Sequence, residues 1–305
     1  MVELSIVMPV YNGESQLNST LASITSQTFN NFELIVVDDG STDGSAVILS
    51  EAARHDPRIR VIHQPNSGIT RALIRGCSEA EAAVIARHDC GDRSMPERFV
   101  HQFELLSRGH VLVASATRFV EPAGLLLYDA RGDGETIRRS LLGDPAGSIR
   151  GIPHHGSAMF RRETYRAAGS YRSQFHLAQD LDLWIRMARL GTIGVTTEIL
   201  YEATVDEKSL SGTSRSEQIR LTAIATALRE GGDEAVLLEA ASRIRPAARS
   251  SSREAAALYF IGKCLLPRNP TEGQRYLRSA LERDPFHLNA RLSLWWTTLR
   301  SIGRG

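Results

Sequence analysis

Residues 32–44, FELIVVDDGSTDG, join an apolar run to a loop of aspartate, glycine and hydroxyl residues. The run Phe32–Val37 is hydrophobic except for one glutamate and ends in β-branched residues, which predicts a strand buried on both faces. The loop that follows supplies turn and N-cap residues, so a helix is expected from about Ser45 to Arg54. A buried strand that leads through such a loop into a helix is the building unit of parallel sheets.

The same unit recurs on both sides of this stretch. Further strands are predicted at Leu4–Val10, Ile59–His63 and Ala83–Arg87, with a helix after the first strand and another at Ile69–Cys77. Strands and helices that alternate in this way form a parallel sheet with helices on both faces. The fold class predicted from the sequence is therefore α/β.

The alternation weakens after about residue 110. We expect strands at His110–Ala114 and Gly156–Phe160, an edge strand or hairpin arm at Gly124–Asp129, and mostly loop from Arg131 to Ile152. Gln179–Leu190 predicts an amphipathic helix.

We place a domain boundary at residue 216. Ser209–Ser216 (SLSGTSRS) predicts a flexible loop, and the chain beyond it predicts helices interrupted by a linker at Arg245–Ser252. Residues 1–216 are expected to form the α/β domain and residues 217–305 a small all-helical region. Trp295 and Trp296 in that region are expected to make packing or partner contacts.

Composition excludes several classes of protein. The 305 residues include 36 basic and 35 acidic side chains, so the net charge of +1 gives no electrostatic case for binding nucleic acid. Cys77, Cys90 and Cys264 are too far apart for a disulfide framework or a zinc cluster. Reduced thiols and the absence of a long apolar run predict a cytoplasmic protein, and docking at the inner face of a membrane stays open.

Three polar loops follow predicted strands, and the carboxyl ends of parallel strands are where such sheets bind ligands. They contain Tyr11-Asn12, Asp38-Asp39 and Asp89 to Asp92. The carboxylates of Asp38 and Asp39 can accept hydrogen bonds from ribose hydroxyls or a base N–H, or they can form a strand-end turn with a helix cap. No G-x-G-x-x-G motif or P-loop is present, which disfavours a dinucleotide fold and excludes a P-loop enzyme.

The loop after the fourth strand is a candidate metal site. Carboxylates such as Asp89 and Asp92 can hold Mg²⁺ or Mn²⁺ against a diphosphate, or they can be an acidic turn before a helix. A capping box at Ser94–Glu97 predicts that this helix begins there. His154 and His155 are set aside as metal ligands because adjacent side chains point in different directions.

Asp180 lies in the first turn of the helix predicted at Gln179–Leu190. Its carboxylate is either a general base or simply an acidic residue favoured by the helix dipole.

Four stretches together resemble family 2 glycosyltransferases in order and spacing: IVMPVYN, FELIVVDDGSTDGS, ARHDCGDRSMPERF and QDLDLWIRMARLG. The resemblance covers about Val2 to Ser216. It implies a GT-A fold, in which a Rossmann-like, mostly parallel sheet is flanked by helices. It also implies inverting sugar transfer from a nucleoside diphosphate sugar.

The resemblance also implies roles for individual residues. Asp180 resembles the catalytic base, Trp184 the aromatic residue that follows it, and Asp89 the first aspartate of the D-x-D motif. The residues implied at the nucleotide are Pro9, Tyr11, Asn12, Asp38, Asp39 (which holds the base), Arg71 and Asp89.

The chain departs from the family pattern at the metal motif. Gly91 stands where the second aspartate of D-x-D is expected, which leaves Asp89 and Asp92 as the implied ligands. The expected cofactor is a divalent cation, Mn²⁺ or Mg²⁺, and whether the protein uses it stays open. Gln179 also replaces the glutamate that often precedes the catalytic aspartate.

The segment at about 253–301 resembles a tetratricopeptide-type helical hairpin, with Gly262, Leu277, Ala280 and Pro285 near the positions of that repeat's signature. One hairpin cannot bury its own apolar face. It is therefore expected to stack on the catalytic domain, on a second copy of the chain or on another protein.

The function expected from the resemblance is transfer of a sugar, with UDP as the expected carrier, to a hydroxyl of a glycan or glycolipid acceptor. The setting implied is synthesis of a surface glycan or lipopolysaccharide. The alternative is a weakly active or inactive relative that binds a nucleotide or glycan. Gly91 favours this alternative, whereas the presence of Asp180 and Asp39 argues against it.

Overall fold

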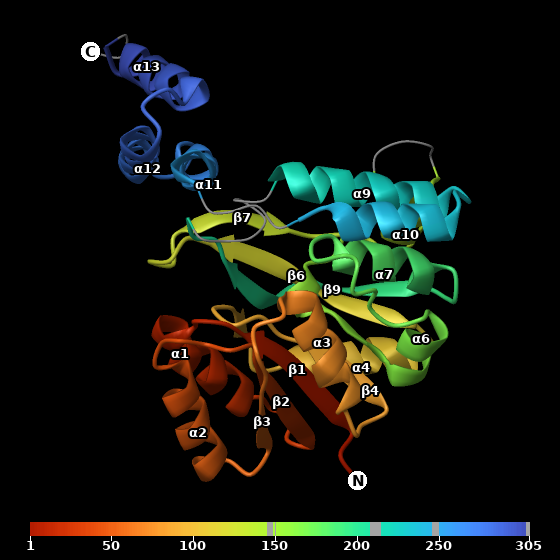
Figure 1. Cartoon of the computed structure of the whole chain (residues 1–305). Helices are drawn as coiled ribbons and strands as arrows, with labels where there is room; N and C mark the ends of the chain where they lie inside the picture. Colours follow the sequence, from red (N-terminus) through yellow and green to blue (C-terminus); the bar gives the residue numbers. More distant parts are fainter. Residues whose placement is uncertain (145–148, 150, 208–214, 246–249, 303–305) are drawn as a thin grey trace. The chain divides into compact units, whose positions relative to one another are not determined.

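The computed structural model describes residues 1–144, 149, 151–207, 215–245 and 250–302, the last five of these by their main chain alone. Across these residues nine strands form one sheet in the order β3-β2-β1-β4-β8-β6-β9-β5, with β7 paired to β6 (Figure 1). The strands are β1 (Leu4–Val10), β2 (Phe32–Asp38), β3 (Ile59–His63), β4 (Val84–Arg87), β5 (Arg93–Ser94), β6 (Leu112–Val120), β7 (Leu126–Ala130), β8 (Met159–Arg161) and β9 (Ile193–Thr204).

The helices are α1 (Glu14–Thr25), α2 (Ser45–His55), α3 (Ile69–Ser78), α4 (Arg98–Ser107), α5 (Gly134–Leu142), α6 (Arg162–Ala167), α7 (Gln179–Ala188), α9 (Arg215–Arg229), α10 (Glu234–Arg243), α11 (Ser251–Leu265), α12 (Pro270–Arg283) and α13 (Leu288–Ile302). A short 3₁₀ turn, η1, covers His155–Ser157. None of the helices in the described ranges is long and apolar enough to cross a membrane.

The first four strands confirm the predicted parallel sheet. β1 pairs in parallel with β2 and β4, and β2 pairs in parallel with β3. Apolar side chains of α1, α2 and α4 pack with one face of these strands, while α3 covers the other face (Figure 1). Gly76 of α3 allows this close approach, because a Cβ there would lie 2.5 Å from Cγ1 of Val7.

The second half of the sheet contains antiparallel pairs. β8 runs antiparallel to both β4 and β6, and β5 runs antiparallel to β9. Because β8 opposes β4, the residues just before β8 lie beside those just after β4. This pairing positions the candidate site described below.

Several boundaries predicted from the sequence were wrong. The segment from Arg131 to Ile152 contains α5, which begins where Asp133 Oδ2 accepts a hydrogen bond from the Thr136 N–H at 2.8 Å and ends at Gly143 with φ 93°. Capping aspartate and C-terminal glycine are helix signals. The strand predicted at His110–Ala114 instead covers Leu112–Val120.

The capping box predicted at Ser94–Glu97 is also wrong. Ser94 belongs to β5, and α4 begins only at Arg98 without a side-chain cap. The Ser94 Oγ instead accepts a hydrogen bond of 3.0 Å from the buried Arg98 guanidinium. β9 and the short helix α6 are further elements that the sequence analysis did not predict.

The chain divides into two compact units, which interleave in sequence. The first contains residues 1–117, 130–203 and 221–243, and the second contains residues 118–129, 204–220 and 244–305. The predicted loop at 209–216 and linker at 245–252 lie largely outside the described residues. The first unit holds every residue proposed for nucleotide binding or catalysis.

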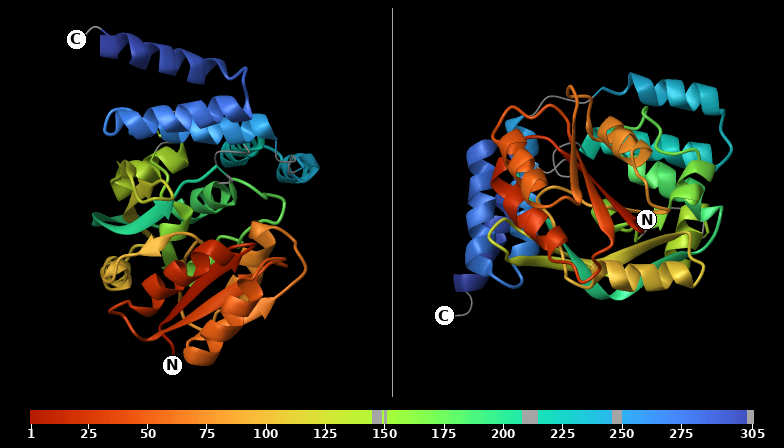
Figure 2. Two further views of the ribbon diagram at one scale, coloured as in Figure 1. Left: turned by 90° about the vertical axis from the view of Figure 1, so that its left-hand side faces the viewer. Right: turned by 90° about the horizontal axis from the view of Figure 1, so that it is seen from below.

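The second unit confirms the predicted C-terminal helices. α11 and α12 lie side by side (Figure 2) and enclose an apolar cluster that includes Leu258, Ile261 and Leu277. A Cβ on Gly262 would lie 2.9 Å from the Gly273 carbonyl oxygen, so the two glycines allow the helices to approach closely. Trp295 and Trp296 lie on α13 and are more than half exposed.

Candidate functional site

The loops after β1, β2 and β4 meet at the carboxyl edge of the parallel strands. Asn12 has a left-handed φ of 52°; its N–H donates to Ser41 Oγ at 2.9 Å and its Oδ1 accepts from the Thr42 N–H at 2.8 Å. A Cβ on Gly13 would lie 2.5 Å from the sulfur of Cys90, so the first and third loops touch. The structure therefore brings together the polar loops that the sequence placed at one edge.

Asp39 holds the segment that leads into α3. One carboxylate oxygen accepts hydrogen bonds from Gln64 Nε2 at 2.7 Å and from the Ser67 N–H and Oγ at 2.9 and 3.0 Å. The other accepts from the Gly68 N–H at 2.8 Å. Among the described contacts this second oxygen accepts only that one bond, so it keeps a lone pair for a further donor such as a base N–H.

Asp38, also buried, accepts from the Ser41 N–H at 3.0 Å and contacts His63 Nδ1 at 3.0 Å. Pro9 is half-buried at the end of β1, whereas Tyr11 and Arg71 are exposed. Thr70 donates a 2.6 Å hydrogen bond to the Phe175 carbonyl, which links the start of α3 to the segment before α7. Arg71 is the residue of α3 next to this link.

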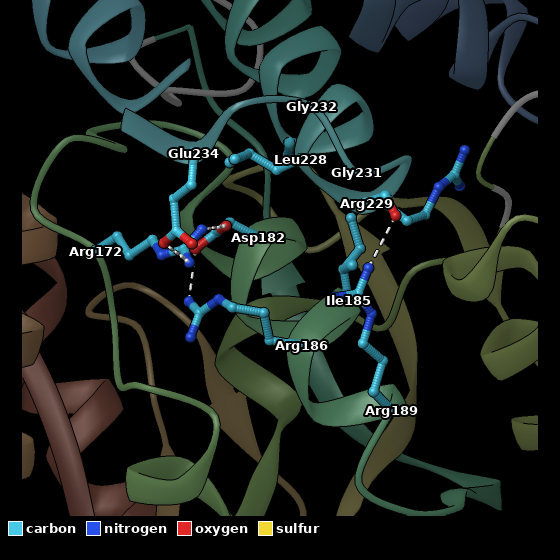
Figure 3. A pocket seen from close by; sticks show the side chains of 11 residues that line it. Arg172, Asp182, Ile185, Arg186, Arg189, Leu228, Arg229, Gly231, Gly232 and Glu234 are labelled. Carbon is cyan, nitrogen blue, oxygen red and sulfur yellow. Dashed lines mark hydrogen bonds and ion pairs between the residues drawn. The ribbon is translucent and has the colours of Figure 1, made fainter. Parts of the chain in front are cut away.

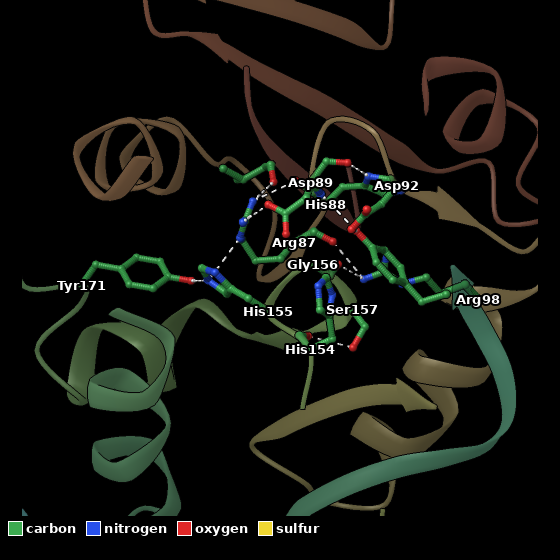
Figure 4. A network of polar contacts seen from close by, with 12 residues as sticks. Arg87, His88, Asp89, Asp92, Arg98, His154, His155, Gly156, Ser157 and Tyr171 are labelled. Carbon is green, nitrogen blue, oxygen red and sulfur yellow. Dashed lines mark hydrogen bonds and ion pairs between the residues drawn. The ribbon is translucent and has the colours of Figure 1, made fainter. Parts of the chain in front are cut away.

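Arg87, at the end of β4, is fully buried and orients Asp89 (Figure 4). Its guanidinium donates to Asp89 Oδ1 at 2.5 Å and to the main-chain oxygens of Val7 and His88 at 3.1 and 2.8 Å. Its Nε–H donates to His155 Nε2 at 3.3 Å. Burial alone would raise the pKa of Asp89, but the charge and hydrogen bond of Arg87, together with the nearby His154 and His155, outweigh it and hold that pKa well below its usual range.

Asp89, Asp92 and His154 form a cluster in which one potential ligand atom from each lies within 4.8 Å of the others. The Tyr201 hydroxyl joins the two aspartates, since it donates to Asp92 Oδ2 at 2.8 Å and accepts from the Asp89 N–H at 3.1 Å. Burial lowers the pKa of His154 to about 4 despite the nearby Asp89 charge, so its imidazole is neutral near pH 7. A neutral imidazole can bind a metal ion.

His154, set aside from the sequence as a metal ligand, lies within reach of both aspartates in the structure. The antiparallel pairing of β8 with β4 brings the turn before β8 to the end of β4, and no local sequence signal reports this pairing. Tyr201 comes from β9, which the sequence analysis did not predict.

Arg98 contacts the main chain and the tyrosine ring that surround the Asp89, Asp92 and His154 cluster. Its buried guanidinium donates to the carbonyls of Arg87 and Gly156 at 2.9 and 3.0 Å, and its carbon centre lies 4.7 Å from the centroid of the Tyr201 ring. It therefore fixes the ends of β4 and η1 and the ring that bridges the aspartates.

Gly91 is required by the main chain. Its φ is +99°, and a Cβ there would lie 2.8 Å from Gln16 Oε1. Residues other than glycine rarely adopt this conformation. An aspartate at this position would therefore strain the loop, which explains why a carboxylate is absent where the D-x-D motif expects one.

Asp180 is the second residue of α7, and the helix is preceded by Ala178, which adopts a left-handed φ of 55°. Its Oδ1 accepts from the Leu181 N–H at 2.8 Å. Burial, together with the charge of Asp89, raises the pKa of Asp180.

Asp182 is two residues further on and faces away from Asp180, as residues two apart on a helix do. It is buried and forms ion pairs with Arg172 at 3.2 Å and Arg186 at 2.5 Å (Figure 3). Arg172 also pairs with Glu234 of α10 at 2.6 Å. Asp182 thus belongs to an ion-pair network behind α7, bordering a hollow of about 250 Å³.

Trp184 is fully buried against His155 and Phe160, with edge-on ring contacts at 5.8 and 5.9 Å. Through these contacts Trp184 packs the centre of α7 against η1 and β8. The aromatic residue in the helix motif is therefore part of the packing that positions Asp180.

Comparison with known proteins agrees with this geometry. Residues 5–169 match the family model described as glycosyl transferase family 2. The chain is 34% identical over 211 residues to the putative glycosyltransferase EpsE of Bacillus subtilis, covering 67% of this chain and 73% of that protein. It is 27% identical to an uncharacterized glycosyltransferase of Rickettsia bellii, covering 62% of this chain but 28% of that protein.

Solved structures show the same fold at low sequence identity. TarS of S. aureus (residues 1–349, in complex with UDP) superposes with a TM-score of 0.58 at 17% identity, covering 93% of this chain and 81% of that one. The mannosyltransferase PcManGT of Pyrobaculum calidifontis, in complex with GDP-Man and Mn²⁺, gives 0.59 at 16% identity, covering 97% and 87%. The chain therefore belongs to glycosyl transferase family 2 and has a GT-A-like fold.

Proposed function

We propose that the protein is an inverting glycosyltransferase that moves a sugar from a nucleoside diphosphate sugar to a hydroxyl acceptor. The observation that carries this proposal is the Asp89, Asp92 and His154 cluster, in a chain whose residues 5–169 match glycosyl transferase family 2. We place the candidate base, Asp180, and this candidate diphosphate site at the two ends of one reaction centre.

In this mechanism Asp180 removes the proton of the acceptor hydroxyl while its oxygen attacks the anomeric carbon. The bond to the diphosphate oxygen breaks on the opposite side of the sugar, so the configuration at that carbon inverts. A raised pKa suits this role, because a more basic carboxylate is a stronger proton acceptor. The left-handed main chain at Ala178 and the packing of Trp184 set the direction of the Asp180 side chain.

We place the nucleotide along the loops that meet at the carboxyl edge. Tyr11 and Pro9 are proposed to contact the base, and Asp39 to hold it through the carboxylate oxygen that accepts from the Gly68 N–H. Asn12 and Asp38 order the loops beneath, and Arg71 supplies positive charge near the diphosphate. We favour UDP as the nucleotide; the solved relative TarS was crystallised with it.

A divalent cation fits the Asp89, Asp92 and His154 cluster, since two carboxylate oxygens and a neutral imidazole nitrogen can converge there. The nitrogen ligand favours Mn²⁺ over Mg²⁺, which takes oxygen ligands. When bound, the ion would offset negative charge on the departing diphosphate. Mn²⁺ is present in the solved relative PcManGT.

The proposed acceptor is a surface glycan or lipopolysaccharide sugar, modified at the cytoplasmic face of the membrane. We assign the chemistry to a transferase domain at residues 1–216 and an accessory role to residues 217–305. The alternative, a weakly active or inactive relative that binds nucleotide, is favoured by Gly91, which stands where the second aspartate of the D-x-D motif is expected.

Thermal unfolding of the full chain with UDP, GDP and their sugars, with and without Mn²⁺, tests the proposal. A ligand at about a hundred times its Kd stabilises the folded protein by about 2.7 kcal/mol, so binding is readily detected. We expect stabilisation by one nucleotide with Mn²⁺ and loss of that effect in Asp89→Ala. No stabilisation at millimolar nucleotide would contradict both proposals. Binding without transfer to any acceptor would favour the inactive relative.

A further inference from the structure

α13 carries an apolar face that points to solvent. Leu288, Leu292, Trp295 and Trp296 are 66%, 47%, 57% and 58% exposed. Their spacing of three and four residues places them on one side of the helix. Phe286, just before the helix, is 86% exposed.

The opposite side of α13 is the one used for packing. Ala290 is fully buried, and it and Leu294 join the apolar cluster formed by α11 and α12. Both lie about half a turn from Leu288 and Leu292. The outer face is therefore additional to what folding of the second unit needs, and among the described residues its large side chains stay uncovered.

The charged residues of α13 have a single sign. In sequence the helix contains Arg291 and Arg300 and no aspartate or glutamate, and Arg291 is exposed. Basic residues on an exposed apolar helix attract anionic lipid headgroups. They also disfavour pairing with a second copy of α13, because two like-charged helices would repel.

We propose that the outer face of α13 docks on an anionic lipid surface, with the two indole rings at the level of the headgroups and Arg291 against a lipid phosphate. Tryptophan suits this position because its ring is apolar and its N–H is polar. The proposal gives a surface for membrane docking and does not depend on sugar transfer.

Vesicle binding by the full chain tests this proposal. In a co-sedimentation assay, the protein should pellet with vesicles of equimolar phosphatidylglycerol and phosphatidylcholine. Far less protein should pellet with vesicles of phosphatidylcholine alone. Replacing Trp295 and Trp296 together by serine should lower the partition coefficient at least about tenfold, since two large apolar side chains no longer leave water. Val236→Ser, at a site on α10 that is 61% exposed, is the matched control and should bind like the wild type.

Tryptophan fluorescence gives a second readout. The only other tryptophan, Trp184, is fully buried, so a blue shift on adding vesicles reports the two on α13. Unchanged binding by a folded double-serine variant would overturn the proposal. A second result would also overturn it: a wild type that does not bind vesicles but forms concentration-dependent dimers, which the same substitutions abolish. That result would assign the face to contact with a second copy of the chain. Nucleotide binding measured in parallel keeps this test separate from the transferase proposal.

Discussion

The Arg87 guanidinium donates a 2.5 Å hydrogen bond to the carboxylate of Asp89, two residues later in the chain. Arg87 is fully buried, and its other N–H groups donate to the carbonyls of Val7 in β1 and His88 and to His155 Nε2. It thus holds Asp89 ionised and in one orientation. Tyr171 extends the network, with its hydroxyl 2.7 Å from His155 Nε2.

Arg87→Lys should weaken UDP-dependent Mn²⁺ binding and lower thermal stability. Lysine keeps the charge but has three donors on one nitrogen, so it cannot reach all the acceptors that the guanidinium serves. Calorimetric titration of Mn²⁺ in the presence of UDP measures the first effect. Arg75→Lys, at an exposed site on α3, is the control. Wild-type metal affinity in folded Arg87→Lys would refute a positioning role for Arg87.

Asp180→Asn and Asp182→Asn should separate chemistry from stability. Asp180→Asn should lower kcat by about 10²–10⁴-fold with little change in nucleotide affinity or in the free energy of unfolding, because it removes a base from the transition state. Asp182→Asn should cost about 3–5 kcal/mol of stability, because it leaves two arginines without their buried partner. Transfer assays and urea unfolding of both variants make the comparison. The reverse pattern would identify Asp182, and not Asp180, as the base.

The kcat of transfer should fall at low pH with a midpoint above the usual aspartate value of about 3.9. Burial raises the pKa of Asp180, and only its deprotonated form accepts a proton. The rate is therefore full above the raised pKa and is lost as the pH falls through it. A pH profile at saturating donor and acceptor measures this midpoint. If the residual activity of Asp180→Asn showed the same fall in kcat at low pH, that fall would have to come from the titration of another group.

Gly91→Asp should fail to tighten metal binding, although it restores the family's motif. The φ of +99° and the contact with Gln16 should make both Gly91→Asp and Gly91→Ala about 1–2 kcal/mol less stable than the wild type. Gly109→Ala shares a positive φ but has open space around the added Cβ, so it separates conformational strain from the clash. Tighter Mn²⁺ binding by a stable Gly91→Asp would show that the loop can rearrange.

The ion pair between Glu217 and Arg253 should stabilise the second unit in a pH-dependent way. Their 2.7 Å hydrogen bond lowers the pKa of Glu217 to about 2, below the unfolded value of about 4.3. This stabilisation is complete above pH 4.3 and is lost as the pH falls toward 2. The difference in unfolding free energy between the wild type and Glu217→Gln should therefore shrink from about pH 6 to pH 3. Glu239→Gln, in an exposed pair, should show no such trend; a constant difference for Glu217→Gln would contradict the assignment.

The sequence alone predicted the parallel half of the sheet and the loops at its carboxyl edge. Strands such as β1 and β2 are buried on both faces, so their residues form apolar runs that can be read without knowing their neighbours. The combination of four motifs predicted the family. The roles of Asp39, Asp89 and Asp180 remain predictions.

Tertiary structure decided the rest of the site. His154 and Tyr201 reach the aspartates only through antiparallel pairing of β8 with β4 and through the long strand β9. Asp89 and His154 are 65 residues apart in the chain, and Asp92 and Tyr201 are 109 apart. Contacts over such separations leave no periodic signal in the sequence of either segment. The positive φ angles of Gly91 and Ala178 and the opposite orientations of Asp180 and Asp182 likewise arise from main-chain geometry and packing. The sequence therefore determines which residue types reach the sheet edge, and packing determines which of them meet.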